Sequence, residues 1–257
     1  MVCEAKTSML TMSDTRSYRY TADSFFVISY SGNHMENLNL FISWLQSDLT
    51  HFIAIAEEGS VVSGDPWQDG FSDHDLTIIV SQDIDSEMKA TYAFLEEYPL
   101  GNEFLVGFQL AHEFTKGNSL NDISMKFRAK TIAGEDVIAS KALPDREKAL
   151  TMGRDGLSNL TKRFERRWLN LSHWSNEYAQ KKNYEIYKNF FVFYGAYCYG
   201  KTGIYPKTRQ AAAASISDDE LAERLLNVTN NIHSSSKLKQ KDAIESALTL
   251  IPRILAN

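Results

Sequence analysis

The 257-residue sequence lacks several features that would assign a chain quickly to a class of protein. It has only 2 cysteines, Cys3 and Cys198, which cannot form the bridge network of a small secreted domain. Its richest apolar run, residues 190–198, is too short to cross a bilayer. Residues 1–15 are polar and lack the apolar segment of a signal peptide. We therefore expect a cytoplasmic protein with no membrane partner.

An excess of positive charge is also missing. The sequence has 27 Lys and Arg against 33 Asp and Glu, for a formal net charge of -6. A broad basic surface, which phosphate contacts along a nucleic acid require, is therefore not expected, and we predict no nucleic-acid partner. A single nucleotide is not excluded, because its phosphates need only one local positive site or a metal ion.

The patterns along the chain divide it into two parts. Strand and helix patterns mix up to about residue 138, and the sequence beyond Pro144 is helical throughout. We predict an α+β fold, with a small mixed β-sheet and flanking helices followed by an all-α helical bundle. The predicted domains are residues 1–145, including an N-terminal arm at 1–32, and residues 146–257.

The first part carries strand and helix patterns in alternation. Strands are predicted at 52–56, 76–80 and 104–110, with an edge strand or irregular arm at 25–30 and helices at 38–49 and 86–98. Residues 122–132 alternate, with Asp122, Ser124 and Lys126 on one side, and we interpret them as a strand.

The second part carries helical periodicity. Helix faces are predicted along 157–171 and 184–198, the latter stopped by Gly200 and Gly203. A capping box at Ser217 and Glu220 predicts a further helix start, and a last helix holds Ile244, Leu248 and Ile251.

One segment of the first part has the residues of a phosphate and metal site. Gly59-Ser60 lies in a turn-rich connection, and Asp73-His74-Asp75 opens a β-branched strand after twelve intervening residues. Two aspartates at i and i+2 project from one strand face and repel each other unless a cation lies between them. Mg²⁺ prefers such oxygen ligands together with substrate phosphates. Gly59 permits close backbone approach, and Ser60 offers a hydroxyl and an N–H to phosphate oxygens.

Each half of this pattern is common alone, in strand ends and in ordinary turns. Their order, their spacing and the strand that follows favour a site. The segment resembles the signature of the polymerase-β nucleotidyltransferase superfamily, in which Gly-Ser precedes an Asp-x-Asp strand at about this distance. The arrangement of a small catalytic part followed by a helical part is most similar to the aminoglycoside and related antibiotic nucleotidyltransferases. Residues 197–208 also resemble the helix-turn of their C-terminal helical bundles. His74 replaces a usual aliphatic residue, and Val61-Val62-Ser63 replaces a frequent arginine.

The resemblance implies a metal-dependent enzyme and assigns roles to particular residues. Asp73 and Asp75 would ligate two Mg²⁺ ions, and Gly59 and Ser60 would hold the triphosphate of ATP or another nucleoside triphosphate. For the third carboxylate of the family we choose Asp122, with Glu113 as the alternative. Lys126, on the predicted strand with Asp122, would contact a phosphate.

The reaction implied is transfer of a nucleoside monophosphate, AMP from ATP first of all, to a hydroxyl of a small molecule, with release of pyrophosphate. The family suggests an aminoglycoside-like antibiotic as this acceptor. Glu177 and Glu185 are alternatives for the catalytic base. Two other functions stay open, a protein-modifying or antitoxin-type nucleotidyltransferase and a nucleotide-binding module without turnover.

Overall fold

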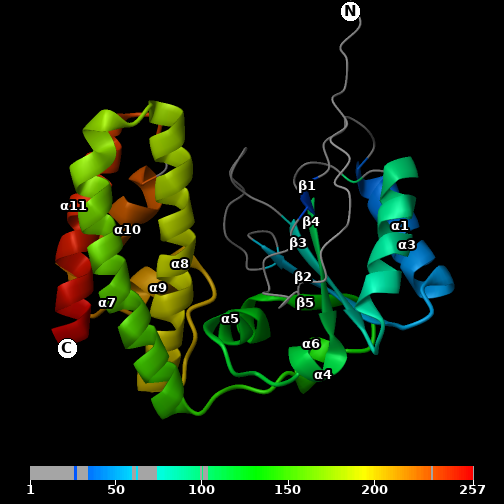
Figure 1. Ribbon diagram of the computed structural model, residues 1–257. Coiled ribbons are helices and arrows are strands. Elements are labelled where there is room, and N and C mark those ends of the chain that lie inside the picture. Colours follow the sequence, from blue (N-terminus) through cyan, green and yellow to red (C-terminus); the bar gives the residue numbers. More distant parts are fainter. Residues whose placement is uncertain are drawn as a thin grey trace, which may run out of the picture.

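The structure is a computed structural model that describes residues 26–27, 34–59, 62, 74–98, 100, 104–232 and 234–256. Among these residues the chain forms a mixed sheet with helices on both faces, followed by a bundle of helices (Figure 1). The predicted α+β class is confirmed. None of the described helices has both the length and the apolar character that a membrane crossing needs.

Within the described residues, five strands form the sheet, in the order β1-β4-β3-β2-β5. Their bounds are β1 Phe26–Val27, β2 Phe52–Gly59, β3 His74–Val80, β4 Phe104–Leu110 and β5 Lys130–Gly134. Strands β3 and β4 are parallel, and the other neighbouring pairs are antiparallel. The predicted strands at 52–56, 76–80 and 104–110 are confirmed, and β1 is the edge strand expected near residue 25.

Helices α1 (His34–Asp48) and α3 (Ile84–Glu97) cover one face of the sheet. Their apolar side chains bury Ile55, Leu76 and Ile78 in the larger of the two sheet cores. The short helices α4 (Ala111–Phe114) and α6 (Val137–Ser140) cover the other face, where they pack on Ala54, Ala56 and Ile79. Because alternate residues of a strand point to opposite faces, each strand divides its side chains between these two cores.

The strand predicted over 122–132 is wrong. Helix α5 occupies Leu120–Arg128, and β5 begins at Lys130. Ser119 and Asp122 form a capping box at the start of α5, a local signal for a helix N-terminus. Leu120, Ile123 and Phe127 follow the helical spacing and pack together against the second part of the chain. Over these few residues the helical spacing of apolar side chains also gives an alternation of polar and apolar positions, which resembles the pattern of a strand.

Every described element from Arg146 onward is helical. The elements are α7 (Arg146–Asn170), a 3₁₀ turn η1 (Leu171–His173), α8 (Asn176–Thr202), α9 (Arg209–Ala214), α10 (Asp219–Asn231) and α11 (Lys237–Ala256). We call this part the helical half and the preceding residues the sheet half. The predicted start of α10 needs correction, since Asp218 rather than Ser217 caps it. The predicted stop at Gly203 is confirmed as the C-cap of α8, whereas Gly200 lies inside that helix.

Helices α7 and α8 approach so closely that glycine is required between them. A Cβ atom at Gly200 would lie 2.4 Å from the backbone N of Leu150, and one at Gly153 would lie 2.5 Å from that of Tyr197. Gly200 therefore belongs to a helix contact, whereas Gly203, with a φ of 81°, provides the left-handed C-terminal turn.

Helix α5 is the part of the sheet half that lies next to the helical half (Figure 1). Its Ile123 is buried together with Ala149 of α7, Ala196 of α8 and Tyr205, which follows α8. This small apolar cluster joins the halves next to the end of the sheet where β2 finishes and β3 starts.

Candidate functional site

Two carboxylates face each other across strands β2 and β3. Glu58 is the register partner of Asp75, and Gly59 is the partner of His74. Directly opposed residues of an antiparallel pair project from the same face, with Cβ atoms about 5 Å apart. Both carboxylate side chains are half-buried. The end of β2 and the start of β3 therefore hold two acids side by side.

Gly59 ends β2 in a backbone conformation that favours glycine. Its φ is 134°, in the region that residues with a Cβ atom rarely adopt. The chain can therefore turn sharply here, immediately beside the two carboxylates. Ser60 and Asp73, predicted as a phosphate contact and a metal ligand, lie outside the described residues, and their roles stay predictions.

Helix α5 covers the sheet face from which Glu58 and Asp75 project. The hydroxyl of Ser124, which is buried, donates to Glu58 Oε1 at 2.9 Å. The acid pair therefore lies on the side of the sheet that faces α5 and, beyond it, the helical half. The opposite face, under α1 and α3, carries the neighbouring residues Glu57 and His74.

Glu57 and His74 form a charged cluster of their own. His74 Nδ1 lies 2.5 Å from Glu57 Oε1, and Lys130 Nζ lies 3.0 Å from the other oxygen. Burial acts to raise the pKa of Glu57, but the contacts with His74 and Lys130 outweigh it and lower that pKa. The His74 ring stacks on Phe104, with centroids 4.7 Å apart. His74 thus makes its contacts on the sheet face under α1 and α3, while Asp75 projects from the face covered by α5.

In the structure, Asp122 makes contacts that differ from those predicted for a third metal-binding carboxylate. Its Oδ2 accepts from the backbone N and the hydroxyl of Ser119, and its Oδ1 lies 2.5 Å from Lys141 Nζ. Burial acts to raise the pKa of Asp122, and the contacts with Lys141 and Ser119 outweigh this and lower it. Since Asp122 caps a helix and neutralises a fully buried lysine, its prediction as a strand-borne third carboxylate does not hold.

Lys126 is also engaged elsewhere. Its ammonium donates to the carbonyls of Ile138 and Ala139, at 2.8 and 2.7 Å. These carbonyls lie in the last turn of α6, where helix geometry leaves backbone oxygens with few partners inside the helix. The prediction that Lys126 shares a strand face with Asp122 and meets a phosphate is not supported by this position.

Glu113, the alternative third acid, lies at the other end of the sheet. Asp75 pairs with Leu105 near the start of parallel strands, whereas Leu110 pairs with Val80 at their ends. Glu113 follows Leu110 on α4 and is exposed. Five strand residues separate the two levels, a distance of about 16 Å.

Glu58 is a candidate site acid that no sequence motif predicted. It directly precedes Gly59-Ser60, which was a signal that it lies near the site. What shows its relation to Asp75 is the antiparallel register of β2 and β3, a long-range property that no local pattern states.

The donor set fits a hard divalent cation. Glu58 and Asp75 offer carboxylate oxygens, which Mg²⁺ prefers, and a cation would relieve the repulsion between them. Among the residues that the structure describes, no group of three or more His, Cys, Asp and Glu is arranged to hold a metal. The described part therefore supplies two carboxylates, and one of them, Asp75, lies two positions after the predicted ligand Asp73 in the sequence.

Comparison with solved structures shows the type of fold. The chain is similar to spectinomycin adenyltransferase AAD(9) from Enterococcus faecialis, solved with ATP and spectinomycin, with a TM-score of 0.54 and 15% identity. The match covers 88% of this chain and 100% of that one. A nucleotidyltransferase-like protein from Exiguobacterium sibiricum aligns over 88% of this chain and 75% of its own, with a TM-score of 0.32 and 12% identity.

No protein-family model matches the sequence, and the search of curated proteins found no match. The structural likeness shows a nucleotidyltransferase fold that resembles the antibiotic nucleotidyltransferases, as the sequence motif predicted.

Proposed function

We propose that this protein is a metal-dependent nucleotidyltransferase that acts on a hydroxyl of a small molecule. The observation that carries the proposal is the pair Glu58 and Asp75, opposed on two strands beside Gly59 with its φ of 134°, in a nucleotidyltransferase fold. An acid pair beside a glycine suits phosphoryl-group chemistry, which depends mainly on positioning and charge neutralisation.

The proposed roles follow from chemistry and position. Asp73, Asp75 and Glu58 would hold Mg²⁺, with Glu58 taking the place for which Asp122 was predicted. When bound, Mg²⁺ neutralises charge on the phosphate oxygens. Gly59 and Ser60 would bind the triphosphate through backbone N–H groups and the serine hydroxyl.

The proposed reaction is an in-line substitution at the α-phosphorus. The acceptor oxygen forms a bond to phosphorus as the bond to the pyrophosphate oxygen breaks, and the hydroxyl proton leaves to a base. Glu177 and Glu185, suggested as this base, are both on α8; Glu177 is exposed, and Glu185 is paired with Lys182 at 2.8 Å. Neither is assigned the role.

The acceptor is proposed from the structural likeness. The similar structure of AAD(9) contains ATP and spectinomycin, so we propose ATP as co-substrate and an aminoglycoside-like or related antibiotic as acceptor. The negative net charge of this chain is compatible with a cationic acceptor. We further propose that residues 1–145 and 146–257 are separate domains that bind nucleotide and acceptor between them.

A substrate screen tests this function. Purified protein is incubated with Mg²⁺, with each of ATP, GTP, CTP and UTP, and with aminoglycosides, spectinomycin or cell lysate, and pyrophosphate release is measured. We expect release that depends on a small-molecule acceptor and is abolished in Asp73→Asn and Asp75→Asn.

The alternatives give different results in the same screen. Labelling of proteins in the lysate, with none of the small molecules modified, would indicate a protein-modifying enzyme. Nucleotide binding without pyrophosphate release under any condition would indicate a binding module and would refute the proposal.

A further inference from the structure

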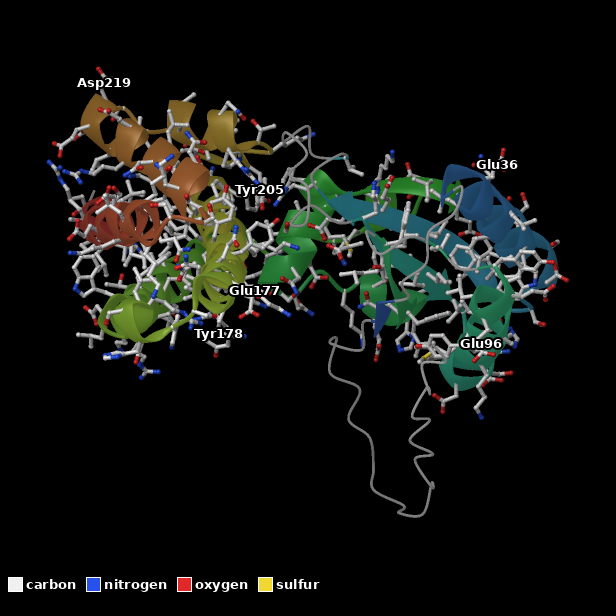
Figure 2. The ribbon with its side chains drawn as sticks, turned by 90° about the horizontal axis from the view of Figure 1, so that it is seen from above. Glu36, Glu96, Glu177, Tyr178, Tyr205 and Asp219 are labelled. Carbon is white, nitrogen blue, oxygen red and sulfur yellow. The ribbon has the colours of Figure 1, made fainter. Side chains whose placement is uncertain are left out.

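Tyr205 belongs to the helical half but reaches toward the acid pair. It follows α8 and lies where this half faces α5 (Figure 2). Its ring stacks on Phe127 of α5, with centroids 5.0 Å apart and an interplanar angle of 8°. On the other side, a Cβ atom at Gly195 would lie 2.4 Å from this ring. Tyr205 is therefore held tightly between α5 and α8.

The Tyr205 hydroxyl is buried in a polar environment. Burial raises the pKa of the phenol, and the nearby Arg128 guanidinium offsets this only in part. Glu58 also acts on it electrostatically. Within the described part of the chain, this hydroxyl has no hydrogen bond of standard geometry. A buried hydroxyl left in this state costs free energy, which suggests a role at this position.

Ser124 connects this hydroxyl to the acid pair. A serine hydroxyl donates one hydrogen bond and accepts up to two. Ser124 uses its donor on Glu58 Oε1 at 2.9 Å, and its lone pairs remain available to the Tyr205 hydroxyl beside it. One path of polar groups therefore runs from Tyr205 through Ser124 and Glu58 to the strand position opposite Asp75.

We propose that Ser124 and Tyr205 are positioning residues for nucleotidyl transfer, which hold the Glu58 carboxylate beside Asp75. The inference rests on the proposed function, in which these two acids bind the metal. Like charges opposed across strands repel, and a glutamate can rotate its long side chain away. A hydroxyl on α5, a helix fixed by the Tyr205 ring, restricts that rotation. The helical half is thereby part of the acid site.

Four single variants test the proposal. Ser124→Ala and Tyr205→Phe each remove one oxygen and keep the packing, whereas Ser124→Thr keeps the hydroxyl. Tyr199→Phe is the matched control, because Tyr199 also packs on Phe127, with centroids 5.4 Å apart. For each protein we measure kcat and KM for the nucleotide, Mn²⁺ affinity by electron paramagnetic resonance, and the thermal midpoint.

We expect Ser124→Ala to lower kcat and Mn²⁺ affinity roughly 10-fold, the size of one hydrogen bond to a charged group, with KM for the nucleotide within about twofold. Tyr205→Phe should lower both in the same direction by a smaller factor, since it acts through Ser124. Ser124→Thr should restore them, and Tyr199→Phe should match wild type.

Equal kcat and Mn²⁺ affinity in Ser124→Ala and wild type would overturn the inference. A loss of kcat and Mn²⁺ affinity that follows a lower thermal midpoint and also occurs in Tyr199→Phe would overturn it as well. Wild type that releases no pyrophosphate would defeat the proposed function, and Mn²⁺ affinity would then decide the inference alone. Absence of Mn²⁺ binding to wild type, or binding that Ser124→Ala leaves intact, would refute it.

Discussion

Glu58 on β2 lies directly opposite Asp75 on β3, with both carboxylates on the sheet face covered by α5. The adjacent pair Glu57 and His74 points to the opposite face and is neutralised there by contact with each other and Lys130. Two consecutive glutamates thus have different surroundings. Glu57 is paired with His74 and Lys130, and Glu58 faces Asp75 in the proposed site.

Replacing Glu58 should change activity far more than stability. Glu58→Gln removes one of two opposed like charges but also weakens the hydrogen bond from Ser124, so the unfolding free energy of the metal-free protein should change by less than about 1 kcal/mol. Pyrophosphate release should fall at least about 100-fold, because charge stabilisation at the phosphate is lost. Thermal unfolding without metal and the release assay measure the two effects. Glu113→Gln is the matched control, at the far end of the sheet; loss of activity there and not in Glu58→Gln would reverse the assignment.

Acid should remove the stabilisation that Glu57 provides. The pKa of Glu57 is lowered in the folded protein below its ordinary value of 4.5. Its contribution is therefore fully present above pH 4.5 and is lost as pH falls through the lower folded value. We expect Glu57→Gln to lower the free energy of unfolding by roughly 1–2 kcal/mol at neutral pH. This difference from wild type should shrink as the pH falls below the folded pKa of Glu57. Urea unfolding of both proteins from pH 7 to about 3.5 measures it. A difference that grows on acidification would contradict the prediction.

Local patterns were sufficient for much of the fold. The β-branched run before Val80 and the spacing of Leu38, Phe41 and Leu45 predicted β3 and α1, which are confirmed. Both signals arise within one element and need no knowledge of its partners. The Gly59-Ser60 and Asp73-His74-Asp75 motif predicted the fold type for a similar reason, because its parts lie close together in the sequence.

The failures have a different physical origin. Whether Glu58 or Asp122 accompanies Asp75 depends on strand register and on where α5 lies, and both are set by tertiary packing. A slip of β2 by one residue would exchange Glu57 for Glu58 on the α5 face. At Asp122, the sequence contains a local capping box with Ser119 that indicates a helix start. The alternation of polar and apolar residues after it indicates a strand, so the two local signals conflict.

The glycine contacts between α7 and α8 give a packing prediction. At Gly153 an added Cβ atom meets the backbone of Tyr197, which cannot yield, so the helices must separate. We expect Gly153→Ala to destabilise by roughly 1–3 kcal/mol in urea unfolding. Gly156→Ala, one turn away, meets the Phe193 side chain, which can rotate, so its cost should be smaller. Equal costs would show that helix propensity or the unfolded state dominates.

Asp122→Asn should separate a structural role for Asp122 from a metal-binding one. Lys141 has a fully buried side chain, so removing the charge of its partner leaves a buried cation, at a cost of about 3–5 kcal/mol. Replacing the ammonium as well, in Asp122→Asn with Lys141→Met, should restore part of this loss, since the cation is gone. If Asp122 does not bind the metal, the Mn²⁺ affinity of each of these two variants that stays folded should equal that of wild type. Urea unfolding and Mn²⁺ titration check these expectations, and weaker Mn²⁺ binding in the stable double variant would return Asp122 to the metal site.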